Sequence, residues 1–329
     1  MTKDNGKLDR REFLKRSTIA TAGFTAGLGL KSTYASASKP EAPIDKTVNA
    51  CSAKQIEILF LGTGAADWPN KYPPIEQKLE KGQVRGLSSI LVNDHILVDC
   101  GPTVIDAMKR FGVDPAGITD ILLTHTHSDH FRENTILAIA NARSADLGPL
   151  RFWAHPEALK YAPKSDRLKM CPVEIGKIFE LGGFRITGLE SNHLVESSKE
   201  KPLYYLLEND TKQFLYATDG AWLLKSTWVH LRNKKLDAII WDATVGERKG
   251  DSRIFEHNDL TMIRHMNRTL KNMKVIKPDS KIILTHMART LHPSHHQLEK
   301  NLLPQGLIPA YDGMLVDLSN PVGAVSPDN

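Results

Sequence analysis

Residues 124–130, with the sequence THTHSDH, constrain this chain more than any other segment. They place three histidines and one aspartate directly after the apolar residues 121–123, which predict the end of a buried strand. Alternation along the strand puts His125 and His127 on the same side, and the Asp129-His130 pair can turn back towards them. Neutral imidazole and carboxylate are suitable ligands for Zn²⁺ and its first-row neighbours. A polar loop that binds nothing is the alternative, but the density of ligand groups favours a metal site.

Further ligand-type residues follow predicted strands along the chain. Apolar alternation and turn residues predict strands over 55–61, 88–92, 95–99, 121–124, 150–154, 184–189, 203–207, 214–218, 238–241, 281–285 and 314–318. Helices are predicted over 103–111, 135–141, 156–161 and 260–273. At or just past strand C-termini come Asp99, His125, His193, Asp219, Asp242 and His286. Functional groups gathered at one edge of a sheet are typical of α/β enzymes, so we expect an α/β fold.

The net charge of +5 is concentrated at the N-terminus. Residues 1–37 contain seven Lys/Arg and three Asp/Glu, whereas the rest of the chain contains 36 basic and 35 acidic residues. The body of the protein therefore offers no polybasic surface for nucleic acid. The three cysteines, Cys51, Cys100 and Cys171, are too few and too scattered for a disulfide framework or a four-cysteine zinc site.

The N-terminal residues 9–15, DRREFLK, resemble a twin-arginine export signal. A mildly apolar run over 17–30 and the small residues 35–37 follow, which is the order of a signal peptide cleaved after Ala37 or retained as an anchor. We therefore expect twin-arginine export to the periplasm or beyond; an amphipathic cytosolic helix is the alternative. The body has no stretch long enough for a transmembrane helix. The predicted division is a signal peptide over 1–37, a linker over 38–53 and one domain over 54–329.

The residues above match, in order, the pattern of the metallo-β-lactamase superfamily, which the sequence resembles over about residues 54–320. The resemblance implies a four-layer αβ/βα sandwich with two divalent metal ions, Zn²⁺ or alternatively Mn²⁺ or Fe, at one edge of the sheets. The implied ligands are His125, His127 and His193 for the first ion, Asp129, His130 and His286 for the second, and Asp219 for both. Asp99 would orient a ligand histidine through its free ring nitrogen. Asp129 is also expected to take part in catalysis.

Within the superfamily, the segments FLGTGA (60–65), LVDCG (97–101), LTH (284–286) and YDGM (311–314) resemble ribonuclease Z and the carbon–phosphorus lyase-associated phosphodiesterase. Asp242-Ala243-Thr244 followed by His257 also fits that branch, and implies that His257 donates a proton to the leaving group. A surface histidine beside a helix start is the alternative for His257.

The chain departs from both of these relatives. It lacks the cysteines of the structural zinc site that the phosphodiesterase relatives often carry, and it has no recognisable Gly/Pro-rich arm of the kind that ribonuclease Z uses to grip tRNA. We therefore expect no stable nucleic-acid partner. The cluster His292, His295 and His296 matches no family ligand and favours a polar helix start over a third metal site.

The leading expectation is an exported phosphodiesterase in which a hydroxide between the two ions attacks phosphorus. Arg289 is a candidate phosphate contact, because a guanidinium can pair with phosphate, and an ordinary surface arginine is the alternative. Trp68 either lines the pocket or packs beside it. Two alternatives stay open: a lactonase, arylsulfatase or other ester or amide hydrolase on the same metals, and an exported metal- or ligand-binding protein without turnover.

Overall fold

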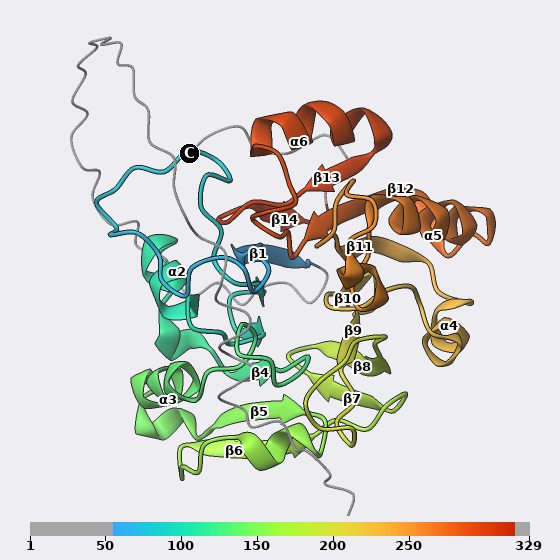
Figure 1. Cartoon of the computed structure of the whole chain (residues 1–329). Helices are drawn as coiled ribbons and strands as arrows, with labels where there is room; N and C mark the ends of the chain where they lie inside the picture. The colour runs from blue at the N-terminus through green and yellow to red at the C-terminus, as the bar shows by residue number, and fades with distance from the viewer. Residues whose placement is uncertain (1–54, 320–329) are drawn as a thin grey trace, which may run out of the picture. The chain divides into compact units, whose positions relative to one another are not determined.

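Two seven-stranded mixed sheets form the centre of the fold (Figure 1). The structure, a computed structural model, describes residues 55–319, so the predicted signal peptide and linker lie outside the described residues. The first sheet has the order β14-β1-β2-β3-β4-β5-β6, with bounds β1 (Glu57–Gly62), β2 (Ser89–Val92), β3 (Ile96–Val98), β4 (Asp120–Leu122), β5 (Leu150–Ala154), β6 (Leu168–Pro172) and β14 (Leu315–Asp317). The second has the order β13-β12-β11-β10-β9-β8-β7, with bounds β7 (Ile178–Leu181), β8 (Phe184–Glu190), β9 (Leu203–Glu208), β10 (Gln213–Ala217), β11 (Leu236–Asp242), β12 (Ile276–Thr285) and β13 (Leu307–Pro309).

Helices cover the outer face of each sheet (Figure 1). Their bounds are α2 (Val104–Arg110), α3 (Glu133–Ala142), α4 (Lys225–Leu231), α5 (Leu260–Asn272) and α6 (His295–Leu302). Short 3-10 turns are η1 (Pro115–Gly117), η2 (Ala145–Leu147), η3 (Ala158–Tyr161), η4 (Ser252–Phe255) and η5 (Leu303–Gln305). Helix α5 shows why the sequence folds this way: Leu260, Ile263, Met266 and Leu270 form its buried stripe, and the Asp259 side chain caps its N-terminus.

Three apolar clusters hold these layers together. The inner faces of the two sheets share one cluster, in which Phe60 of the first sheet and Tyr205 and Ile240 of the second are buried. A second cluster lies between the second sheet and α4, α5 and α6, and a third lies between the first sheet and α2 and α3. Helix, sheet, sheet and helix thus form four layers, which confirms the predicted αβ/βα sandwich.

The strand C-termini carry the site. His125 follows β4, His193 follows β8, and Asp242 is the last residue of β11. Asp99, Asp219 and His286 come directly after strands or one residue later, and each has a positive φ, of 64°, 59° and 55°. This left-handed backbone is costly for residues other than glycine and is common where a chain turns sharply at a functional site.

The predicted helices at 103–111, 135–141 and 260–273 agree with α2, α3 and α5, whereas 156–161 forms only the 3-10 turn η3. Strands β6, β7 and β13 and helix α4 were not predicted, and only the start of α6 was, because short elements offer too few residues for a periodic pattern. Within residues 55–319, no helix combines the length and the apolar character that crossing a membrane requires.

Candidate metal centre

Loops after four strands of the two sheets, β4, β8, β10 and β12, bring the predicted ligands into one group. Ligand atoms within 4.8 Å of one another form three sets that contain only predicted ligands: His125, His127 and His193; Asp129, His130 and His286; and His125, His130 and Asp219. A fourth set joins Asp219 to Asp242, His257 and His286. All seven residues assigned as ligands from the sequence are therefore neighbours in space, and Asp219 contacts both halves of the group.

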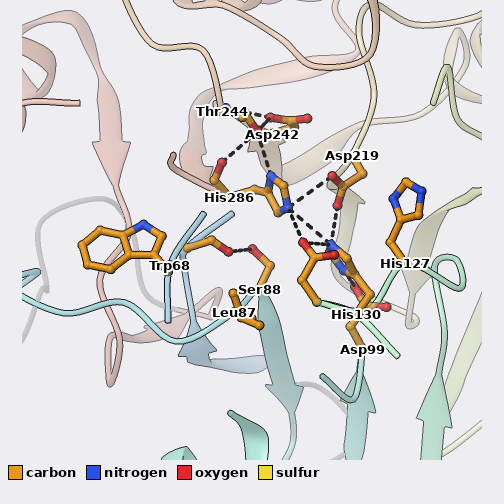
Figure 2. Close-up of polar contacts among 12 residues, drawn as sticks. Trp68, Leu87, Ser88, Asp99, His127, His130, Asp219, Asp242, Thr244 and His286 are labelled. Atoms are coloured by element: carbon orange, nitrogen blue, oxygen red, sulfur yellow. Dashed lines mark hydrogen bonds and ion pairs between the residues drawn. The ribbon is translucent and has the colours of Figure 1, made fainter. Parts of the chain in front are cut away.

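In the first half of the group, three imidazole rings meet. His127 Nδ1 lies 3.0 Å from His125 Nε2 and 3.1 Å from His193 Nε2. In the second half, His130 Nε2 lies 3.3 Å from His286 Nε2. Figure 2 shows the ring of His286 beside Asp219 and His130, with His127 on the far side of Asp219.

Two carboxylates complete the second half. Asp219 Oδ2 lies 2.7 Å from His130 Nε2, and Asp219 Oδ1 lies 3.2 Å from His286 Nε2 (Figure 2). Asp129 Oδ2 lies 3.3 Å from His130 Nε2 and 3.5 Å from His286 Nε2. Both carboxylates are buried.

This arrangement fits metal ions. Each close pair of ring nitrogens can share one proton at most, so unshared electron pairs of several imidazoles converge on the same points. Asp219 Oδ2 is buried and accepts no hydrogen bond of good geometry within residues 55–319. Buried polar atoms without partners are rare in proteins, and a cation at each point would satisfy them. Nitrogen and oxygen donors of this kind suit Zn²⁺ and its first-row neighbours.

The outer ring nitrogens of the ligand histidines are held by other groups. His130 Nδ1 donates to Asp99 Oδ2 at 2.8 Å, and Asp99 Oδ1 accepts from the backbone N–H of Thr124 at 2.8 Å. His286 Nδ1 lies 2.7 Å from Thr244 Oγ1, and His193 Nδ1 lies 3.2 Å from the backbone oxygen of Glu256. Such contacts select the tautomer and orient the ring of a metal ligand.

Glycine is required two residues after Asp99. A Cβ at Gly101 would lie 1.8 Å from the backbone oxygen of Asp129, so the chain after β3 can approach the ligand loop only without a side chain. The adjacent Cys100 donates its backbone N–H to His130 at 2.8 Å, and its thiol is buried and free.

Glu200 was not predicted, although it holds the central segment. Its Oε1 accepts the backbone N–H of Thr126 at 2.9 Å, and its Oε2 accepts the Thr126 hydroxyl at 2.6 Å. Glu200 is buried and lies in the loop that also carries His193. It therefore ties the His193 loop to the backbone between His125 and His127. No local signal identifies a glutamate 74 residues away as a partner of Thr126.

The electrostatics of the group follow from burial and close opposite charges. Burial opposes charge on His130, but the carboxylates of Asp219, Asp129 and Asp99 outweigh it and hold the pKa of His130 well above its ordinary value. Burial, together with the neighbouring histidines, lowers the pKa of His125. Burial also disfavours ionised Asp219, yet His286 and His130 keep the pKa of that carboxyl well below its usual range.

His257 lies against the same group. Its Nδ1 is 2.7 Å from Asp242 Oδ2 and 3.4 Å from Asp219 Oδ1, and its ring stacks on His286 with centroids 5.4 Å apart. Burial opposes its charged form, but the carboxylates of Asp242, Asp219 and Glu256 raise the pKa of His257 to about 9. The residue is therefore part of the site and not a surface histidine beside a helix.

A cavity of about 270 Å³ opens onto this group. Its walls combine predicted site residues with others that the sequence did not single out. The lining residues are Ala65, Ala66, Asp67, His127, Asp129, His193, Asp219, Thr244, Arg253, Glu256, His257 and His286.

The two predicted substrate contacts, Trp68 and Arg289, are not among the lining residues. Trp68 packs over Gly64, and its indole N–H donates to the backbone oxygen of Met287 at 2.8 Å, so it supports the backbone beside the cavity. The Arg289 side chain is exposed, and its backbone N–H donates to Asp67. Arg253 is the arginine that lines the cavity; it stands four positions before His257, and spacing alone does not reveal where it points.

The histidines near α6 do not form a third metal-capable group within residues 55–319. His292 Nε2 donates to the backbone oxygen of Ala243 at 2.8 Å, and His295 is the first residue of α6 with its Nδ1 3.1 Å from Arg85 Nη2. Both therefore hold neighbouring segments together, and His295 lies at the start of a helix, as predicted.

Comparison with known proteins shows which family model and which curated proteins this sequence resembles. A family model described as "Beta-lactamase superfamily domain" matches residues 94–287. A ribonuclease Z of Mycobacterium marinum is 39% identical over 105 residues, which are 31% of this chain and 34% of that protein. A ribonuclease Z of Gemmatimonas aurantiaca is 34% identical over 99 residues, which are 29% of this chain and 27% of that protein. The matched region thus spans about a third of these curated relatives.

Solved structures share the fold at low sequence identity. A metallo-β-lactamase fold protein from Bacillus subtilis has a TM-score of 0.60 at 17% identity, covering 80% of this chain and 99% of that chain. A diphosphatase of the PhnP family has a TM-score of 0.60 at 18% identity, covering 79% of this chain and 97% of that one. The short form of human tRNase Z has a TM-score of 0.56 at 18% identity, covering 79% and 98%.

Proposed function

Because this chain belongs to the metallo-β-lactamase superfamily, on a family match to more than half of its residues, we propose that it is a metal-dependent phosphodiesterase. The observation that carries the proposal is the convergence of seven nitrogen and oxygen ligands around Asp219, which offers one carboxylate oxygen to each of two histidines in the second half of the group. The next support is His257, which is held beside the ligands by Asp242.

Chemistry at phosphorus is supported by the relatives. The curated relatives are named ribonuclease Z, and one solved structure is a diphosphatase. Both names describe cleavage of bonds to phosphate. A site with two divalent ions also suits a phosphate ester, because two cations can balance the negative charge of its oxygens.

His125, His127 and His193 would hold one ion, Asp129, His130 and His286 the other, and Asp219 both, with Zn²⁺ as the proposed metal. When bound, the ions would activate a water for attack and neutralise charge on the phosphate. His257 would donate a proton to the departing oxygen, since its ring borders the cavity and Asp242 fixes its Nδ1 side. Arg253, at the cavity wall, would contact phosphate oxygens.

We propose small phosphodiesters as the substrates, with no stable nucleic-acid complex. The chain outside residues 1–37 is nearly neutral, with 36 basic and 35 acidic residues, whereas binding to a polynucleotide draws most of its energy from phosphate neutralisation by basic side chains. A cavity of about 270 Å³ also suits a small ligand.

The test compares reaction classes on one preparation. The protein would be stripped, reloaded separately with Zn²⁺, Mn²⁺ or Fe²⁺, and assayed on bis(p-nitrophenyl) phosphate, a lactone, an aryl sulfate and nitrocefin. We expect turnover of the diester to exceed the other three. Turnover of the lactone, sulfate or lactam with no diester hydrolysis would make the protein a different hydrolase, and two bound ions without any turnover would make it a binding protein.

We also propose that the protein is exported by the twin-arginine machinery, which is supported by the DRREFLK sequence at residues 9–15. Fractionation of cells that express the full chain would test this. We expect the wild type outside the cytoplasm and the double variant Arg10→Lys, Arg11→Lys inside it. Export of the double variant to the same extent as the wild type would contradict the twin-arginine proposal.

A further inference from the structure

Some of the titratable side chains that line the cavity are not assigned as metal ligands. They are Asp67, Arg253, Glu256 and His257. The imidazole of His257 has a proposed role as proton donor. The other three side chains set the charge that the cavity wall presents to a ligand in addition to the metal ions, and their partners show which of these charges remains available.

Asp67 and Arg253 are both engaged with neighbouring groups. The Asp67 carboxylate accepts the backbone N–H groups of Arg289 at 2.7 Å and Thr290 at 3.1 Å, and also the Thr290 hydroxyl at 2.9 Å. Arg253 donates from Nε and Nη2 to the two oxygens of Asp251, at 2.8 Å each. Arg253 can therefore still donate from Nη1 to a ligand, but the carboxylate of Asp251 balances its charge.

The Glu256 carboxylate has no such partner. Its Oε2 lies 3.9 Å from His193 Nδ1, which is beyond hydrogen-bond distance. That ring nitrogen donates instead to the backbone oxygen of Glu256 at 3.2 Å. Within residues 55–319, no N–H or O–H group donates to the Glu256 carboxylate, and its side chain is 36% exposed. Its negative charge is therefore not used by the fold.

The charge of Glu256 acts on rings that line the cavity. Besides the contact with His193, burial lowers the pKa of His127, and Glu256 is one of the carboxylates that oppose this shift. Burial also opposes charge on His257, and Glu256 is among the carboxylates that raise the pKa of His257 to about 9. All three imidazoles border the cavity, so the Glu256 carboxylate stands at the cavity wall beside the first half of the metal centre.

A carboxylate at this place changes which phosphate is preferred. By itself the metal centre would favour the ligand with the most negative charge, because two divalent ions outweigh the ligand carboxylates of Asp129 and Asp219. A phosphodiester carries one negative charge, whereas a phosphomonoester has a second pKa near 6 and carries about two charges at pH 8. A fixed negative charge at the wall repels the monoester more strongly than the diester and opposes the preference of the ions.

We propose that Glu256 is a specificity-determining residue, which selects singly charged phosphodiesters against doubly charged phosphomonoesters through its charge. The proposal rests on the proposed function and deepens it at the same site. Hydrolysis of a diester by water yields an alcohol and a phosphomonoester, so the same repulsion promotes release of the charged product. The role requires neither a hydrogen bond to the ligand nor a proton transfer.

Binding of two small phosphates, which needs no turnover, tests this inference. Phosphorus NMR titrations of the Zn²⁺-loaded protein at pH 8 would compare dimethyl phosphate with methyl phosphate, because these ligands differ by one charge and one methyl group. Glu256→Gln keeps the shape of the side chain and removes its charge. We expect this variant to raise the affinity for methyl phosphate, relative to that for dimethyl phosphate, by about 3- to 10-fold.

A charge series separates this role from a structural one. Glu256→Lys should move the ratio of the two affinities further in the same direction, and added salt should reduce the difference between the variants, because the side chain is partly exposed. Glu256→Gln should melt at the same temperature as the wild type, since the carboxylate accepts no hydrogen bond. Glu180→Gln, at an exposed position of β7, which contributes no residue to the cavity, is the matched control and should leave the ratio unchanged.

The outcomes distinguish this inference from the proposed function. A ratio that Glu256→Gln leaves unchanged, or that Glu256→Lys moves in the opposite direction, would overturn the role of Glu256 even if the protein hydrolyses diesters. A ratio that shifts as expected in a protein that hydrolyses no diester would overturn the phosphodiesterase and retain the charge selection.

Discussion

Asp242 holds His257 through a contact of 2.7 Å between Oδ2 and Nδ1, and Asp242 is itself buried at the end of β11. The carboxylate therefore fixes one side of the imidazole and leaves Nε2 as the nitrogen that can exchange a proton with a ligand. This pairing orients the ring for the proton donation proposed above.

His257→Ala should lower kcat by about 10² to 10⁴ for a diester with an alkyl leaving group, because an alkoxide needs a proton as it departs. For bis(p-nitrophenyl) phosphate the loss should be much smaller, since p-nitrophenolate leaves without one. Steady-state kinetics on both substrates measure the difference, with His265→Ala on the exposed face of α5 as the control. Equal losses on both substrates would show that His257 is not the proton donor.

Chelation should remove two ions and lower the melting temperature by roughly 10 °C, because ligands bound 1,000-fold above their dissociation constant contribute about 4 kcal/mol to stability. Elemental analysis of the reloaded protein should give two ions per chain, and Asp219→Ala should give fewer. Asp210→Asn, at an exposed aspartate of the β9–β10 hairpin, should retain both ions. A melting curve that chelation leaves unchanged would argue against metal binding at this site.

Glu200→Ala should destabilise the protein by about 2–3 kcal/mol, because it leaves the N–H and hydroxyl of Thr126 without their acceptor. Glu200→Gln keeps one acceptor and should cost less. Because Glu200 joins the two loops that carry His125, His127 and His193, the alanine variant should also weaken the first metal site, as titration of the stripped protein would measure. A variant with lower stability and unchanged affinity for both ions would restrict Glu200 to a structural role.

His295 should make stability dependent on pH in the acid range. Burial and the nearby Arg85 and Lys81 lower the pKa of His295 to about 4, although Glu299 opposes the shift. The unfolded chain takes up this proton near pH 6.5 and the folded protein near 4, so stability is full above pH 6.5 and falls as the pH drops through that window.

The variant His295→Gln should show a smaller loss of stability between pH 6.5 and 4, with a slope reduced by at most about 1.4 kcal/mol per pH unit, the value for one proton. Chemical denaturation across this range measures the slope. His296→Gln, at the exposed neighbour, is the control for the loss of an imidazole alone. Parallel curves for wild type and His295→Gln would show that His295 does not contribute.

Much of the metal centre follows from the sequence alone. The run at residues 124–130, and the aspartates and histidines after later strands, are local patterns: an apolar run ends and a ligand residue follows within a few positions. Because parallel strands point their C-termini to one edge, such residues are brought together by the fold class itself. That reasoning anticipated that His125, His193 and His286, which come from three different loops, belong to one metal centre.

Only the tertiary structure decides which other side chains surround that centre. Arg253 and not Arg289 lines the cavity, and Glu200 holds Thr126 from 74 residues away. Neither of these follows a period or a spacing, because each depends on the path of a loop and on contacts between distant segments. Strand order and alternation are local properties of the chain, whereas the direction of a loop side chain is set by packing and hydrogen bonds that form only when the two sheets meet.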